Sequence, residues 1–233
     1  MMDRPYYSDR HDAGRVLAKH LSRYKDQPNV LVLALPRGGV AVAFEVAQAL
    51  HAPLDVCVVR KLGLPGHEEY AMGAIASGGV RVINPLPGIT IAQEAVAAVL
   101  AKEQNELLRR EQLYRAQRPP VKMTGRTVIL VDDGLATGAT MRAAAVSVRQ
   151  QHPARLVVAV PVGARESCQS LRDVADEIVC PAMPKNFHAL SLWYKFMPQA
   201  SDEEVRTLLQ KGWREHSPTI QLTAKSAAHP AGR

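Results

Sequence analysis

The sequence predicts an α/β protein with a central, mostly parallel sheet flanked by helices. Short apolar runs alternate with segments of helical spacing along the 233 residues, which is the pattern of successive β-α-β units. The runs do not alternate with polar residues, as expected of strands buried on both faces. Several end in loops rich in glycine or charge, and sheets of this kind bind ligands at those strand ends.

Five apolar runs, rich in Val, Leu and Ile, predict the strands of this sheet. They span residues 29–35, 53–59, 127–131, 155–160 and 177–180. The Gly- and Pro-containing stretch 62–69 is expected to be a loop, and 84–88 a turn. Segments 70–76 and 79–83 predict two short strands joined at Ser77-Gly-Gly79, which is a hairpin signal.

Apolar residues at helical spacing predict a helix before or after most of these strands. Ser8 or Asp9 is suited to cap the first helix, Thr90 and Gln93 form a capping box before a long one, and Ser201 caps the last. The expected helices span residues 8–24, 40–50, 90–116, 141–151, 165–174 and 201–212.

Residues 1–212 are expected to form one domain, and the polar residues 213–233 a disordered tail. Two segments are expected to border the ligand site. The polar, Gly-rich segment 62–80 is expected to close over the site as a flexible lid. Segment 181–198 carries two of the three Phe and one of the two Trp residues, and it is a candidate hood over the site.

Composition excludes several classes of protein. No apolar run approaches the ~20 residues of a membrane span, and the N-terminus lacks the apolar core of a secretion signal. Three cysteines without a CxxC pair predict neither a disulfide framework nor a zinc site and fit a reducing cytoplasm. The net charge of +7 is spread along the chain and aromatic residues make up only 5%, which makes a dedicated nucleic-acid surface a weak expectation.

The most informative stretch is Val128–Met141, which reads as a buried strand, two acids, a loop of small residues and a helix. A helix N-terminus with free N–H groups and nearby hydroxyls is a natural phosphate site. Asp132 and Asp133 suit the hydroxyls of a sugar, or a divalent cation. The loop that would hold the phosphate consists of Gly134, Leu135, Ala136, Thr137, Gly138, Ala139 and Thr140.

Two more polar segments follow predicted strands. Pro36-Arg-Gly-Gly39 offers the Arg37 cation and the backbone of Gly38 and Gly39 after the first strand, and Arg60-Lys61 follows the second. Because parallel strands end at one edge, the three segments are expected to share one crevice, with cations and N–H donors facing a second anionic group. The alternatives are an ordinary turn and a solvated charge pair.

The stretch 128–141 resembles the motif with which type I phosphoribosyltransferases bind 5-phosphoribosyl 1-pyrophosphate (PRPP). It departs from the motif at Gly134, where many members carry a branched apolar residue. Leu35–Gly39 resembles the pyrophosphate loop of that family, and Val59–Pro65 is similar to the Arg-Lys segment that precedes the flexible catalytic loop of adenine phosphoribosyltransferases.

Residues 5–212 as a whole, including Ala71–Ala76 and the Ser-Asp-Glu-Glu-Val start of the last helix, are most similar to a bacterial branch of predicted phosphoribosyltransferases that is sometimes fused to a hydrolase domain. The resemblance implies the type I fold, with PRPP and Mg²⁺ as ligands. It implies an enzyme of nucleotide salvage that transfers the phosphoribosyl group to a nucleobase or similar nitrogen acceptor and releases pyrophosphate. A cytoplasmic homodimer that binds small molecules, and neither membrane nor nucleic acid, is expected.

The resemblance also assigns roles to residues. Asp132 and Asp133 take the ribose hydroxyls and reach Mg²⁺ through water, without a direct protein cage. Residues 134–140 bind the 5′-phosphate. The pyrophosphate ligands are Arg37, Gly38, Gly39, Arg60 and Lys61. The residues expected to be catalytic are Asp132, Asp133, Arg60 and Lys61. The family's transition state is oxocarbenium-like, so the protein must stabilise the leaving charge, position the nucleophile and exclude water.

The residues that recognise the acceptor stay open at this stage. Flat bases stack on aromatic rings, and the hood offers three candidates, Phe187, Trp193 and Tyr194. The alternative is that these rings pack a C-terminal element on the sheet. In the lid, His67, Glu68 and Glu69 are candidates for a catalytic base or for lid contacts, with ordinary surface positions as the favoured alternative.

Two other functions compete with transfer. One is a non-catalytic sensor of PRPP or nucleotides that binds nucleic acid, which the net charge of +7 would favour. The other is a different phosphate enzyme on the same fold, such as a phosphatase or a phosphorylase. A P-loop nucleotide site is excluded, because the sequence contains no GxxxxGK[ST] motif.

Overall fold

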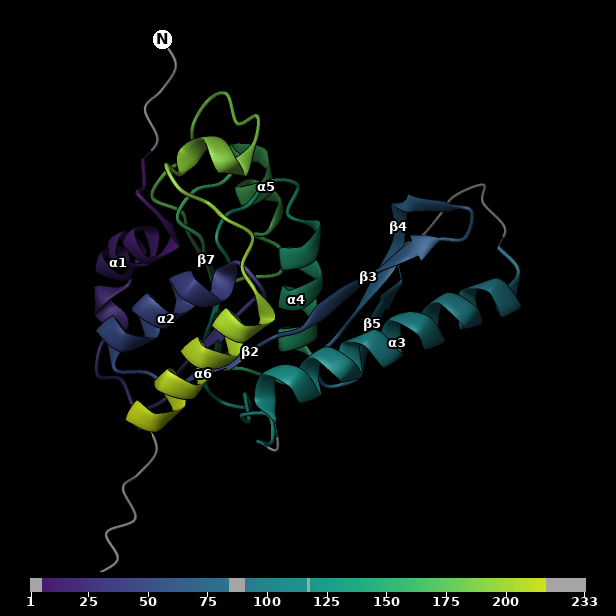
Figure 1. The fold of residues 1–233 in the computed structure, drawn as a ribbon, viewed down its shortest axis with the longest axis horizontal. Helices are drawn as coiled ribbons and strands as arrows, with labels where there is room; N and C mark the ends of the chain where they lie inside the picture. Colours follow the sequence, from purple (N-terminus) through teal and green to yellow (C-terminus); the bar gives the residue numbers. More distant parts are fainter. Residues whose placement is uncertain (1–5, 84–90, 117, 217–233) are drawn as a thin grey trace, which may run out of the picture.

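A five-stranded sheet, parallel throughout, forms the centre of the protein (Figure 1). The computed structural model describes residues 6–83, 91–116 and 118–216, so the predicted turn at 84–88 lies outside the described residues. The strand order is β2-β1-β6-β7-β8. The strands are β1 (Val30–Ala34), β2 (Leu54–Val56), β6 (Thr127–Val131), β7 (Arg155–Ala159) and β8 (Glu177–Val179). The predicted α/β class and mostly parallel central sheet are confirmed.

Both faces of this sheet are covered by helices because its strands are apolar on both sides. In β1, Val30, Val32 and Ala34 belong to one core cluster, whereas Leu31 and Leu33 belong to the other, as the alternation of side chains along a strand requires. The first cluster contains residues of α1 (Arg10–His20), α2 (Gly39–Leu50) and α6 (Asp202–His216); the second contains residues of α4 (Ala139–Arg149) and α5 (Arg165–Ser170). Each fully buried leucine contributes about 1.5–3 kcal/mol.

A second, antiparallel sheet lies beside the first, in the order β3-β4-β5. Its strands are β3 (Val59–Leu64), β4 (His67–Ala76) and β5 (Val80–Ile83), and the helix α3 (Gln93–Arg115) packs along them. Together they form an extension that we call the arm, and Figure 1 shows it projecting to one side. The predicted hairpin between 70–76 and 79–83 is confirmed as β4 and β5.

The predicted loop at 62–69 is wrong for most of its length. Strand β3 continues to Leu64, and β4 begins at His67. The turn-forming residues occupy only the tip, where Gly66 adopts a positive φ of 79°. The register of the pair shifts on both sides of Gly63, which is how a sheet absorbs a residue that does not fit the ladder.

The arm is fastened to the central sheet at the C-terminal end of α3. Arg115 is 3% exposed, and its Nε lies 3.0 Å from Oδ1 of Asp55, which is 2% exposed. Arg115 also binds Glu111 at 2.8 Å and donates to the Val56 carbonyl, while Asp55 accepts from the N–H of Val121 at 3.1 Å. Each charge of the buried pair thus has several partners, which is the condition for burying it.

Several helix ends differ from their predictions by a few residues, and those of α3 and α6 affect the arm and the expected tail. Helix α3 begins at Gln93 with Ala92 at its N-cap and no side-chain cap; Thr90 lies outside the described residues. Helix α6 continues to His216, beyond the expected start of the tail, because the Trp213 indole is 9% exposed and donates to the Leu54 carbonyl at 2.8 Å. The predicted cap of α6 is confirmed, since Ser201 Oγ accepts from the N–H of Glu204 at 3.1 Å.

The hood is built from two distant parts of the chain. The N–H of Tyr7 donates to the Trp193 carbonyl at 3.1 Å, and the N–H of Lys195 donates to the Tyr7 carbonyl at 2.9 Å. Residues 190–193 form a short 3₁₀ helix, η2 (Leu190–Trp193), and a second one, η1 (Ser22–Tyr24), follows α1. The start of the described chain therefore holds segment 181–198 at the C-terminal edge of the sheet. In the described ranges, no helix is long and apolar enough to cross a membrane.

Candidate functional site

The two acids and the Pro36–Gly39 loop are in direct contact at the C-terminal edge of the sheet. Asp132 and Asp133 follow β6, and the loop follows the neighbouring β1. A Cβ atom on Gly38 would lie 1.9 Å from Oδ2 of Asp133, and one on Gly39 would lie 2.8 Å from Cα of Asp132. A side chain at Gly39 would therefore meet backbone atoms, and one at Gly38 would displace the Asp133 carboxylate. The structure thus brings together two segments that the sequence predicts to share a crevice.

The loop 134–140 wraps around the N-terminus of α4. Gly138 has a φ of 77°, which favours glycine, and α4 begins at the next residue. Backbone hydrogen bonds fix the loop against the β7 side of the sheet: Leu135 donates to Val162 at 2.9 Å and Ala164 donates to Leu135 at 2.8 Å. A cavity of about 230 Å³ is lined by residues 132–141 and Leu190. Its donors and the helix N-terminus suit a phosphate.

The acid pair is electrostatically strained. Burial raises the pKa of Asp132 well above its ordinary value, and the negative charge of Asp133 raises it further, while Arg10 lowers it. The side chain of Asp132 accepts from the N–H of Asp133 at 2.8 Å. A site of this kind favours a ligand that brings hydroxyl donors or positive charge, because either would stabilise the ionised form.

We expect Asp132→Asn to stabilise the protein near neutral pH. When folding raises the pKa of a carboxyl, the free energy of unfolding falls as the pH rises from the pKa of the unfolded state through the pKa of the folded state. The variant should match the wild type near pH 4 and become the more stable of the two proteins as the pH rises toward 8. Thermal unfolding measured from about pH 4 to pH 8 tests this.

Asp173→Asn is the matched control, because hydrogen bonds from Arg142 lower the pKa of Asp173. That group contributes stability above its unfolded pKa, so its replacement should reduce stability at neutral pH. If both variants shift in the same direction, the electrostatic strain at Asp132 is refuted.

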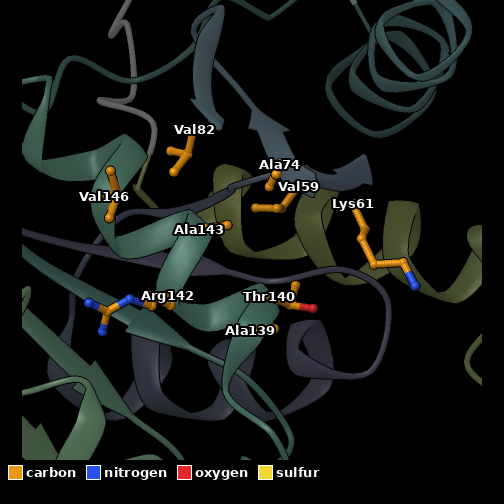
Figure 2. Close-up of a pocket in the computed structure, with 10 residues that line it drawn as sticks. Val59, Lys61, Ala74, Val82, Ala139, Thr140, Arg142, Ala143 and Val146 are labelled. Carbon is orange, nitrogen blue, oxygen red and sulfur yellow. The ribbon is translucent and has the colours of Figure 1, made fainter. Parts of the chain in front are cut away.

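Arg60 and Lys61 lie on opposite faces of β3, because successive side chains of a strand alternate. Arg60 binds Oε2 of Glu103 on α3 through Nε at 2.8 Å and Nη2 at 2.6 Å. Lys61 instead lines a cavity of about 160 Å³ between the arm and α4, together with Thr140. Figure 2 shows the Lys61 amine and the Thr140 hydroxyl on one side of that cavity and Arg142 on the other. The structure therefore brings Lys61, but not Arg60, beside the phosphate loop.

The three aromatic candidates of the hood are not equivalent. Trp193 is 5% exposed and Tyr194 is 4% exposed, in a cluster with Tyr7. Phe187 is partly exposed and stacks on Trp193 with ring centres 6.5 Å apart. The Tyr194 hydroxyl donates to the Asp133 carbonyl at 2.5 Å. Trp193 and Tyr194 thus pack the hood, and Tyr194 also holds the backbone of Asp133, which leaves Phe187 as the more accessible ring.

Leu190 is a site residue that the sequence does not reveal. A Cβ atom on Gly134 would lie 2.1 Å from Cδ1 of Leu190, so the missing side chain at Gly134 makes room for a leucine of the hood.

In the arm, His67 is exposed and its ring meets that of Tyr70 edge to face, with ring centres 6.5 Å apart. The structure does not describe the side chains of Glu68 and Glu69.

Arg10 is the second residue that the sequence analysis missed. Its Nε lies 2.8 Å from Oδ2 of Asp133, and both side chains are 13% exposed. The two residues are 123 positions apart, so no local motif joins them. The one local signal is a basic residue in the first turn of a helix, where the helix dipole disfavours positive charge.

Comparison with known proteins is consistent with this geometry. The family model described as "Phosphoribosyl transferase domain" matches residues 7–191. Proteins from two strains of Mycobacterium tuberculosis, CDC 1551 / Oshkosh and H37Rv, carry "phosphoribosyl transferase" in their names and are 45% identical over 226 residues. The match covers 96% of this chain and 50% of theirs, so the chain spans about half the length of these curated relatives.

A solved structure also matches over most of the chain. The crystal structure of TT1426 from Thermus thermophilus is 41% identical and superimposes with a TM-score of 0.78. It covers 88% of this chain and 98% of its own. The overall fold therefore has a counterpart among experimentally determined structures.

Proposed function

Because the chain belongs to the phosphoribosyl transferase domain family, we propose that it transfers the 5-phosphoribosyl group of PRPP to a nitrogen acceptor such as a nucleobase and releases pyrophosphate. The observation that carries this proposal is the contact between the acid pair and the Gly38-Gly39 backbone. This contact supports the proposal because the proposed sites for a phosphate, for sugar hydroxyls and for a second anionic group then follow one another in the order of the groups in PRPP.

Each part of PRPP has a proposed partner in this chain. The 5′-phosphate binds the N–H groups and hydroxyls of 134–140, and the ribose hydroxyls bind Asp132 and Asp133. The N–H of Gly39 donates to the Leu35 carbonyl at 3.1 Å, so Arg37 and Gly38 are the proposed pyrophosphate donors of that loop. Lys61 supplies a further positive charge beside Thr140. These groups stabilise the charge that develops on the leaving pyrophosphate.

Magnesium is the proposed cofactor, and the acid pair suits a hydrated magnesium ion. Two carboxylates side by side suit a hydrated Mg²⁺, which keeps several waters and binds through one or two carboxylates and substrate oxygens. Within the described ranges, no group of three or more His, Cys, Asp or Glu side chains is placed to hold a metal ion. Bound with PRPP, Mg²⁺ would neutralise pyrophosphate charge, and Asp132 and Asp133 would hold it through water.

The arm and the hood have proposed roles in keeping water from an oxocarbenium-like transition state. The hood lies over the acid pair through Tyr194 and over Gly134 through Leu190. The hairpin of β3 and β4 carries Lys61 and is the proposed lid. Phe187 is the proposed aromatic contact for the acceptor, because its ring is less buried than those of Trp193 and Tyr194.

The test is pyrophosphate release from PRPP in the presence of Mg²⁺ across purines, pyrimidines and small heterocyclic acids. We expect release with at least one acceptor, and we expect Asp133→Asn to reduce it by about 100-fold or more, because a ribose contact is lost in the transition state. Asp173→Asn is the matched control, since Asp173 pairs with Arg142 and is not among the residues that line the cavity at the acid pair.

Two outcomes separate the competing functions. Full activity in Asp133→Asn would refute the assignment of the acid pair. PRPP binding without release for any acceptor, combined with nucleic-acid binding that weakens with salt, would support the sensor that the net charge of +7 favours.

A further inference from the structure

Arg10 stands where the acid pair, the Gly38 loop and the hood meet. Its Nε donates to Oδ2 of Asp133 at 2.8 Å, and its Nη1 donates to the Pro198 carbonyl at 2.6 Å. A Cβ atom on Gly38 would lie 3.1 Å from the same Nε. One guanidinium therefore contacts an acid at the end of β6 and the last residue of the hood, and it borders the loop that follows β1.

This position is unfavourable for the helix that carries it. Arg10 is the first residue of α1, which is already capped by Asp9, whose side chain accepts from the N–H of Asp12. A cation in the first turn of a helix opposes the helix dipole. The guanidinium is also largely withdrawn from water, at 13% exposure. The negative charge of Asp133 compensates for both costs. The ion pair therefore stabilises the Asp133 carboxylate and not helix α1.

Three hydrogen bonds fix the orientation of Asp133. Its N–H donates to Asp132 Oδ1 at 2.8 Å, its carbonyl accepts from the Tyr194 hydroxyl at 2.5 Å, and its Oδ2 accepts from Arg10. The first two hold the backbone, whereas the bond from Arg10 holds the carboxylate. Without Arg10, the Asp133 carboxylate would lose its cation and would face Asp132 with its charge uncompensated.

We infer that Arg10 is a positioning residue for phosphoribosyl transfer: it orients the Asp133 carboxylate toward the ribose and joins that orientation to the seating of the hood through Pro198. The inference rests on the proposed function. Arg10 itself need not touch PRPP, because its effect passes through Asp133. A planar guanidinium suits this role better than an ammonium, because it donates from two separate nitrogens to two acceptors in fixed directions.

The experiment is a calorimetric titration of PRPP with Mg²⁺ into the wild type, Arg10→Gln, Arg10→Lys and Arg15→Gln, with thermal unfolding of each. Arg15 is the matched control on the same helix; it is 56% exposed and reaches Asp12 at 3.6 Å and Glu45 at 3.9 Å. We expect Arg10→Gln to weaken PRPP binding by about 10- to 100-fold, the range for loss of a charged hydrogen bond. Arg10→Lys should recover part of this, and Arg15→Gln should match the wild type.

In turnover, the KM for PRPP should rise in Arg10→Gln while the KM for the acceptor stays unchanged. A purely structural role would instead lower the folded fraction and leave both KM values as they are, which would overturn the inference. So would PRPP binding in Arg10→Gln equal to that of the wild type. If the wild type binds no PRPP, the proposed function fails, and the inference fails with it.

Discussion

Replacing Gly38 by alanine should reduce phosphoribosyl transfer by at least about 100-fold, the cost of misplacing a reacting group by about 1 Å. The new Cβ would lie 1.9 Å from Oδ2 and 2.7 Å from Cγ of Asp133, so the carboxylate must move away from Arg10 and from the ribose. The backbone of Gly38 has φ −59° and ψ −37°, which alanine adopts readily. The loss should therefore come from the site and not from the backbone.

Pyrophosphate release and PRPP binding measure this effect, and thermal unfolding separates it from a loss of folding. Gly212→Ala in α6 is the control, because a Cβ there would lie 3.1 Å from a flexible end of Leu54 and far from the acids. It should leave activity unchanged. Wild-type activity in Gly38→Ala would mean that Asp133 can leave its observed position without cost.

The largest expected change in stability follows replacement of Arg115 by methionine. Asp55 would then keep a buried charge without its cation, which costs about 3–5 kcal/mol. For a chain of this size the melting temperature should fall by about 2–4 °C per kcal/mol. Chemical denaturation, with the midpoint and slope compared, measures the change in unfolding free energy.

Two further variants make this prediction specific. Asp55→Leu combined with Arg115→Met removes both charges and should recover most of the loss, because an apolar pair of similar volume often replaces a buried ion pair. Arg110→Met breaks a pair with Glu106 in which both side chains are 28% exposed, and it should cost about 1 kcal/mol or less. Equal losses at Arg110 and Arg115 would contradict the role of burial.

The central sheet is predictable because its strands carry their own signal. Thr127–Val131 is apolar apart from its first residue, and every position in it is buried, so the run in the sequence and the strand in the structure coincide. The arm is harder to predict. Gly63, Pro65 and Gly66 indicate a loop, but a register shift and a tight turn accommodate them within a hairpin. Pairing with a partner strand outweighed local preference.

The residues of the candidate site likewise differ in how well the sequence predicts them. Segments that carry a local pattern, such as the acid pair and the Pro36–Gly39 loop, could be located from the sequence, and the structure brings them into contact. Arg10 and Leu190 could not, because each acts through a contact with a distant part of the chain. The local signal at Arg10, a basic residue in the first turn of a helix, does not reveal Asp133 as its partner. Long-range contacts of this kind become visible only when the chain is folded.

Because side chains alternate along β3, the order of Arg60 and Lys61 decides which of the two lies beside Glu103 and which lies beside Thr140. Exchanging the two residue types would keep length and net charge, yet it would set an ammonium opposite Glu103, where a guanidinium now binds through two nitrogens. It would also set a rigid, planar cation beside Thr140. A basic dipeptide in a related chain is therefore equivalent to this one only when the arginine comes first.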